Sequence, residues 1–161
     1  MAFKICLKIG DIKGESGTAG HIGEIDVLSW NWGLTQSASA HIGTGGMASG
    51  AADVKDLTIT KYVDKSTPAL LQACFRGSNQ KEAVLTVIKA SGDSAIEFVK
   101  ITMGGTVVVS SVKTGDPLPN DMYAETVTLN FANVKFEYKP QLADHTEGAV
   151  ATAEFDIPKG V

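Results

Sequence analysis

The feature that most constrains this fold is a period-two alternation of apolar and polar residues that recurs along the whole chain. In residues 3–9 an apolar side chain stands at every odd position. This is the pattern of a strand with one face on a core. Similar segments, each bounded by turn-forming residues, lie at 25–32, 54–62, 83–89, 95–103, 106–113, 123–138 and 150–157. The sequence predicts a mostly β protein, a β-barrel or a sandwich of two antiparallel sheets.

The alternation changes phase within two of these segments. Ile25 and Val27 share one parity, whereas Leu28 and the two tryptophans that follow share the other. A second change falls near Ala132–Asn133. Such a change predicts a β-bulge or a bend, because one extra residue turns every later side chain to the opposite face. We expect Trp30 and Trp32 to face the core.

One helix is predicted, at residues 67–76, flanking the β structure. Ser66 stands at the N-cap position, and Pro68 suits the first turn. Arg76 and Gly77 form a basic last turn followed by a C-terminal glycine. The apolar flank carries, at helical spacing, Leu70, Leu71 and Cys74.

Size and charge limit the other possibilities. A chain of 161 residues with 43% hydrophobic residues is enough for one domain, spanning 1–161. The net charge is −4, and no lysine or arginine cluster is present, so nucleic acid is not an expected partner. No run of 18 apolar residues and no signal peptide is visible, so membrane insertion is not expected either. Cys6 and Cys74 are interpreted as reduced, packed thiols.

No catalytic or ligand motif is complete. The three histidines, His21, His41 and His145, lack the partner spacing of a zinc site and are predicted at the surface. Glu24 and Asp26 share a parity and are interpreted as a solvated strand edge rather than an acid–base pair.

Three further partial motifs lack the surrounding residues or structure that their function requires. Residues 43–48 fit a dinucleotide fingerprint but lack the helix and the acidic residue that must follow it. Ser16 is one residue short of a nucleophile elbow, and Cys74 lies on an apolar flank where thiols are inert. We therefore predict a protein that is not an enzyme, with no cofactor and no metal.

Residues 35–52 contain no charged residue and are dominated by Ala, Gly, Ser and Thr. The segment is too long and too small-sided for an ordinary connection. Small side chains allow another backbone to approach closely, so we expect this segment to pack on neighbouring subunits. The predicted interface residues are Ser39, Ala40, His41, Ile42, Gly43, Thr44, Gly45, Gly46, Met47, Ala48 and Ser49.

Several long motifs occur in an order that resembles a known family. They lie at residues 8–16, 24–33, 60–68, 109–112 and 125–132, so the likeness runs nearly end to end. On these motifs the chain resembles the haemolysin-coregulated proteins (Hcp), the tube subunits of the bacterial type VI secretion system.

The resemblance implies a β-barrel flanked by a helix, homo-hexameric rings, and stacking of the rings into a hollow tube inside a contractile sheath. It implies no catalysis. The implied partners are the sheath, a spike protein and secreted effectors carried in the lumen. The implied location is the bacterial cytoplasm before firing, then the extracellular space or a target cell. If the tryptophans face the core, Asn31 faces away from it, and the resemblance makes the lumen its destination.

A second reading stays open at this stage. A monomeric β-barrel module could bind a small ligand in a pocket lined by the tryptophans. A hydrolase would require a nucleophile and a base that the sequence does not display. Light scattering separates the first two readings, because a tube subunit has the mass of a ring and the module the mass of one chain.

Overall fold

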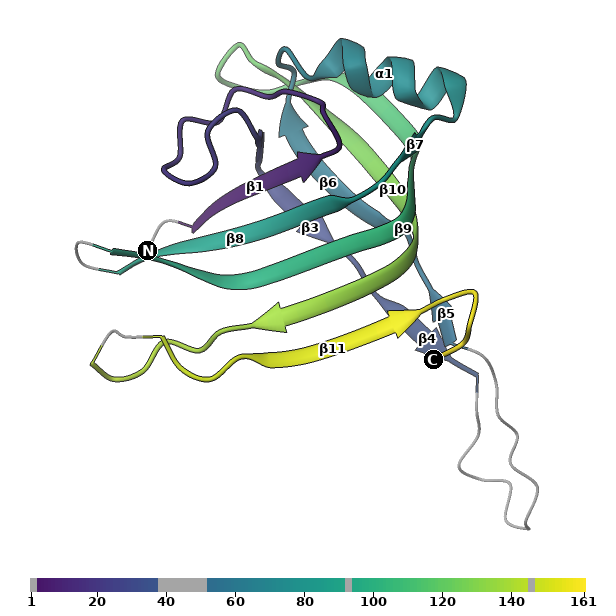
Figure 1. Ribbon diagram of the computed structural model, residues 1–161. Coiled ribbons are helices and arrows are strands. Elements are labelled where there is room, and N and C mark those ends of the chain that lie inside the picture. Colours follow the sequence, from purple (N-terminus) through teal and green to yellow (C-terminus); the bar gives the residue numbers. More distant parts are fainter. Residues whose placement is uncertain (1–2, 38–51, 92–93, 145–146) are drawn as a thin grey trace.

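One long antiparallel sheet curls almost into a barrel, with a helix across one end (Figure 1). The computed structural model describes residues 3–37, 52–91, 94–144 and 147–161. The elements are β1 Phe3–Ile9, β2 Ile25–Val27, β3 Ser29–Asn31, β4 Leu34–Gln36, β5 Ala52–Val54, β6 Leu57–Tyr62, α1 Thr67–Arg76, β7 Asn79–Gln80, β8 Ala83–Ser91, β9 Ser94–Pro117, β10 Tyr123–Tyr138 and β11 Ala151–Asp156.

The sheet closes through a strand that changes partner. Its order is β2-β1-β8-β9-β10-β6-β3, so β2 and β3 stand at opposite ends although only Leu28 separates them in the chain. β2 pairs with β1 and β3 pairs with β6, while the Leu28 amide donates to the Thr60 carbonyl at 2.7 Å. The predicted bend at Val27–Leu28 is confirmed, and it joins the two ends of the curled sheet.

The predicted break at Gly104–Gly105 is wrong. β9 runs through both glycines and pairs with β8 along its first half and with β10 along most of its length. The β9–β10 register shifts between Phe131 and Asn133, which confirms the bulge predicted there. Gly105 has φ +76°, and a Cβ on it would lie 2.9 Å from the Ala132 Cβ. The glycines therefore let a long strand bend at a bulge rather than end in a turn.

The core fills the inside of the curled sheet. Its fully buried side chains include Leu7, Ile9, Ile25, Leu57, Ile59, Leu70, Leu85, Ile101, Met103, Val127 and Leu129. Trp30 and Trp32 pack against this core, as predicted, but each stays partly exposed. The Trp32 ring meets Phe131 edge-on at a centroid distance of 6.2 Å.

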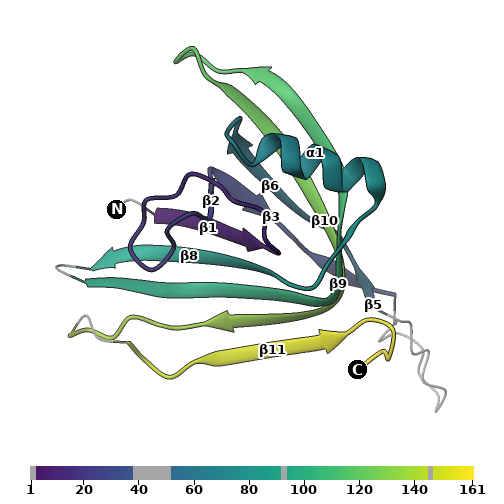
Figure 2. The ribbon, with the colours of Figure 1, turned by 45° about the horizontal axis from the view of Figure 1, so that its top comes forward.

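The helix α1 packs against β9 at one end of the sheet (Figure 2). Its bounds match the predicted 67–76, and Gly77 ends it in the left-handed conformation (φ 58°). Ser66 precedes the helix as predicted, but its side chain does not cap the helix. Ser66 has helical dihedrals, and its hydroxyl donates to the Asp64 carboxylate rather than accepting from the helix amides.

The remaining strands form the opposite end of the molecule. β4 and β5 make a separate two-stranded ribbon, away from α1 in both views (Figures 1 and 2). β11 pairs with the second half of β10, along Asn133–Tyr138. Within the described ranges, no helix is long and apolar enough to cross a membrane.

Candidate functional site

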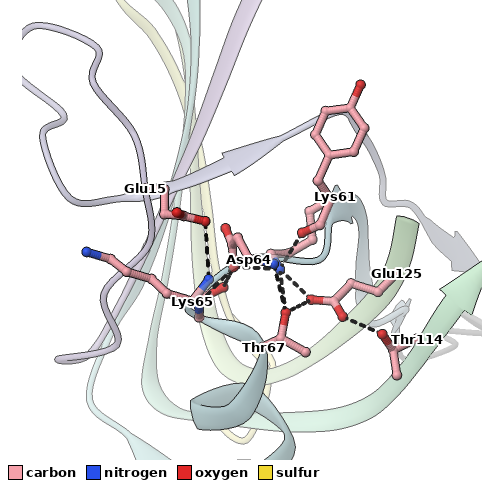
Figure 3. Close-up of polar contacts among 9 residues, drawn as sticks. Glu15, Lys61, Asp64, Lys65, Thr67, Thr114 and Glu125 are labelled. Carbon is pink, nitrogen blue, oxygen red and sulfur yellow. Dashed lines mark hydrogen bonds and ion pairs between the residues drawn. The ribbon is translucent and has the colours of Figure 1, made fainter. Parts of the chain in front are cut away.

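A buried ion pair lies where β6, β10 and α1 meet (Figure 3). Lys61 on β6 and Glu125 on β10 are direct cross-strand partners, and both are 0% exposed. The Lys61 ammonium contacts Glu125 Oε1, lies 3.1 Å from Asp64 Oδ1 and donates to the Tyr62 carbonyl at 2.9 Å. Burying a charge is costly unless it is paired and hydrogen-bonded, and here each charge has several partners.

Two threonines complete this cluster. The Thr67 hydroxyl, at the first position of α1, donates to Glu125 Oε1 at 2.7 Å. The same hydroxyl oxygen accepts the Asp64 amide at 3.1 Å. Thr114 of β9 donates to the second carboxylate oxygen of Glu125 at 2.8 Å. The cluster therefore ties the start of α1 to strands β6, β9 and β10. Its two central charges, Lys61 and Glu125, are 0% exposed and cannot contact a substrate from solution.

The sequence analysis missed this cluster although a signal for it was present. Lys61 continues the parity of Leu57 and Ile59, which face the core. Glu125 likewise continues the parity of Val127 and Leu129. A charge on the apolar parity of two neighbouring strands indicates a buried pair when the strands are in register.

The second polar cluster surrounds His21 and corrects two predictions. His21 is only 8% exposed, so its predicted surface position is wrong. Its Nδ1 lies 2.9 Å from Glu24 Oε2 and its Nε2 lies 2.8 Å from Glu97 Oε1. Glu24 is thus a partner of the histidine and not part of a solvated edge. His41 and His145 lie outside the described residues.

The two carboxylates govern the protonation of His21. Burial alone lowers the pKa of the imidazole, but the hydrogen bonds and charges of Glu24 and Glu97 outweigh it, so the pKa is raised above the ordinary value. Sequence spacing indicates only half of this arrangement, because Glu24 is three residues away and Glu97 comes from a distant strand.

Cys6 and Ser16 lie buried beside each other. Both cysteines are free, and Cys6 is buried, with its sulfur 3.6 Å from the Ser16 hydroxyl. Burial raises the pKa of the Cys6 thiol, which makes it less reactive. Ser16 is itself 4% exposed. Among the residues that the structure describes, no group of three or more His, Cys, Asp or Glu side chains is arranged to hold a metal ion.

An apolar hollow of about 250 Å³ lies between the β4–β5 ribbon and the β10–β11 pair. Trp32 lines it, but Trp30 does not, and the Trp32 indole N–H already donates to the Lys55 carbonyl at 2.9 Å. The lining residues are Trp32, Leu34, Ala52, Val54, Val134, Phe136, Ala153, Glu154 and Phe155. Small-ligand sites add convergent polar groups to an apolar wall, and Glu154 is the one charged residue here.

β11 and the second half of β9 each have an edge without a strand partner within the described part of the chain. β11 pairs with β10 on one side only. Beyond Val109, β9 likewise pairs with β10 on one side only. Unpaired edges offer a row of backbone donors and acceptors to another chain.

Of the predicted assembly residues, Asn31 alone lies within the described ranges. Asn31 is exposed on β3, between the two partly buried tryptophans, so its side chain faces away from the core as expected. The predicted interface residues 39–49 lie outside the described residues.

Comparisons with known proteins agree with one another. Residues 6–138 match the family model described as "Type VI secretion system effector, Hcp". Protein hcp1 of Pseudomonas aeruginosa is 51% identical over 144 residues, which cover 89% of this chain and 88% of that protein.

Solved structures share the fold over nearly the whole chain. A structure described as a type six secretion system protein has a TM-score of 0.90 and 26% identity, covering 99% of each chain. Hcp1 from Salmonella typhimurium has a TM-score of 0.76 and 32% identity, covering 99% of this chain and 97% of that one.

Proposed function

This chain belongs to the Hcp family of the type VI secretion system, and from that membership we propose that six copies close into a ring and that the rings stack into a hollow tube. The family is one of structural tube proteins and is not an enzyme family, as the sequence analysis predicted. The match of residues 6–138 to the family model is the observation that carries the proposal.

The strand edges support ring formation. The outer edge of β11 and the second half of β9 each have one side without a strand partner in the described residues. A contact between two different edges is heterologous, and a heterologous contact closes into a ring when its rotation is right. Pairing these edges between copies would also remove an aggregation hazard.

We assign two segments to the assembled tube. Residues 39–49 pack on neighbouring subunits, and Asn31 faces the lumen and contacts effectors carried there. The sheath, the spike protein and secreted effectors are the partners of the assembled tube. The chain is held in the bacterial cytoplasm and then expelled to the extracellular space or a target cell.

Mass measurement on the purified chain tests the ring. Light scattering should give about six times the 16.9 kDa of one chain, and negative-stain images should show annuli. Deleting residues 43–50 should reduce the mass toward one chain while the circular dichroism spectrum keeps its β signature. Replacing the same residues by a Gly–Ser stretch of equal length separates the effect of side chains from that of length.

The competing function, a monomeric small-ligand module, has one observation in its favour, the apolar hollow beside Trp32. A stable mass of one chain at high concentration, with no annuli, would favour that module and overturn the tube.

A further inference from the structure

His21 is held by carboxylates at both ring nitrogens, and this has a consequence for its proton count. Each ring nitrogen lies within 3 Å of a glutamate oxygen, Nδ1 at 2.9 Å from Glu24 and Nε2 at 2.8 Å from Glu97. An ionised carboxylate only accepts hydrogen bonds, and a neutral imidazole donates only one. Both bonds are therefore made at once only by the doubly protonated imidazolium.

The charges around His21 favour the same state. A cavity of about 250 Å³ beside His21 is lined by five charged groups: Lys8 of β1, Glu24 of the loop, Glu82 just before β8, and Glu97 and Lys100 of β9. Two lysines and three glutamates leave one excess negative charge. A protonated His21 offsets this one negative charge, whereas a neutral ring leaves it uncompensated.

His21 lies on a loop that folds back on itself. We call residues 14–24 the His21 loop. The Gly14 amide donates to the Gly23 carbonyl at 2.8 Å, and the Gly23 amide donates to the Ser16 backbone carbonyl at 2.9 Å. A Cβ on Gly14 would lie 2.4 Å from the Glu24 carbonyl oxygen, so a glycine is required for this close approach. The loop is thus a defined unit.

Side chains attach the His21 loop to two distant elements. Glu15 accepts the Lys65 amide at 3.2 Å, just before α1 (Figure 3). His21 reaches Glu97 on β9, where the β8–β9 register shifts between Val87 and Ile88. A bulge re-aims side chains, and here it falls beside the residue that binds the imidazole.

We propose that His21 is a pH-sensitive clasp that holds the His21 loop against β9 only while both ring nitrogens carry a proton. When one proton leaves the ring, one of the two carboxylates faces the lone pair of a bare ring nitrogen. Both groups are then acceptors, so that hydrogen bond is lost. Glu97 is the partner that releases, because its side chain is 43% exposed and water can replace the bond, whereas Glu24 is 16% exposed and lies on the same loop. This device belongs to the single chain and does not depend on ring formation.

The direction of the response follows from the raised pKa of His21. The clasp is closed below the ordinary histidine pKa of about 6.5 and opens as the pH rises through the higher value in the folded chain.

Hydrogen-exchange mass spectrometry on the full chain tests this. Exchange in peptides covering residues 17–24 is measured from about pH 6 to about pH 9, a span that brackets ordinary and raised histidine pKa values, and is corrected for intrinsic rates. We expect roughly tenfold faster corrected exchange at the alkaline end, since bonds to charged groups are among the strongest in proteins.

Two isosteric variants sharpen the test. In Glu97→Gln the amide can accept from a protonated Nε2 or donate to a bare one, so the loop should stay protected at every pH. Glu82→Gln removes the same charge from the cavity, but Glu82 is not one of the two hydrogen-bond partners of His21, so the pH response should persist. A flat wild-type profile, or equal behaviour of the two variants, would overturn the clasp.

Discussion

The two ionic clusters each attach a segment to the same sheet, but they differ in how far their charged side chains are exposed to water. Lys61 and Glu125 are 0% exposed and join the start of α1 to the strands. His21 and Glu97 join the His21 loop to β9, but the Glu97 side chain is 43% exposed. The charges of the first attachment are out of contact with water. The second keeps one water-accessible partner, Glu97, and a histidine whose pKa is raised above its ordinary value by the two carboxylates.

The comparison teaches that burial, more than the number of bonds, decides what a charge contributes. We call a fully buried ion pair such as Lys61 and Glu125 a sealed pair. If one partner is lost, water cannot solvate the other, so the two charges contribute to stability as one unit. In the His21 cluster water can replace a released partner, so the attachment is reversible. The substitutions below should separate these two behaviours. All should be measured at one protein concentration, because assembly stabilises the folded state.

Glu125→Gln should have the largest effect. It leaves the Lys61 ammonium buried with one carboxylate, Asp64, instead of two. Breaking a buried pair costs about 3–5 kcal/mol, so the urea midpoint should fall steeply. The double variant Lys61→Met with Glu125→Leu is the control and should recover most of the loss. If the single variant is as stable as the natural chain, the cluster does not behave as a sealed pair.

Thr67→Val should have the next largest effect. The valine keeps the shape of the threonine but removes the hydroxyl that donates to Glu125 and accepts the Asp64 amide. The Asp64 amide then loses its acceptor, while Glu125 keeps Lys61 and Thr114. A polar group that loses its partner in this way costs about 1–3 kcal/mol. Thr126→Val, on a half-buried position of β10, is the matched control and should change the unfolding free energy by a smaller amount. Equal losses in the two variants would count against a special role for Thr67.

Local patterns predicted most of the fold. The bounds of α1 and β10 match their predicted ranges because Pro68, Gly77 and the alternation along β10 are signals carried by neighbouring residues. The Gly104–Gly105 break failed because a glycine pair is compatible with a turn or a bulge, and only pairing with the long β10 decides between them.

The two clusters were not predicted, since each depends on contacts between distant strands. Lys61 meets Glu125 only through the β6–β10 register, and His21 meets Glu97 across 76 positions of sequence. The parity of Lys61 was a usable signal, but nothing in the residues around His21 indicates Glu97. Alternation predicts on which face of the sheet a side chain lies. It does not predict which residue of another strand that side chain meets, because strand order and register depend on the whole fold.

His21→Gln should lower the free energy of unfolding only modestly, and its main effect should be on how that free energy depends on pH. Below about pH 6.5 the imidazolium contributes fully, and the contribution disappears as the pH rises through the raised pKa of His21. The variant should therefore lose about 1 kcal/mol in mildly acidic solution and little in alkaline solution. This is less than the roughly 1.5–3 kcal/mol of a buried hydrogen bond to a charged group, because Glu97 is 43% exposed. Urea midpoints of both chains across this pH range measure it. A constant difference would mean that His21 contributes packing alone.

Lys55→Ala should have the smallest effect. Lys55 and Asp53 form an ion pair, but their side chains are 56% and 62% exposed. Water solvates both partners before and after the change, so the attraction roughly cancels against the entropy of fixing two side chains. The unfolding free energy should change by less than about 0.5 kcal/mol, and by still less at high salt. Since this pair has the same kinds of charge as Lys61 and Glu125, a loss comparable to that of Glu125→Gln would show that burial is not what separates the clusters.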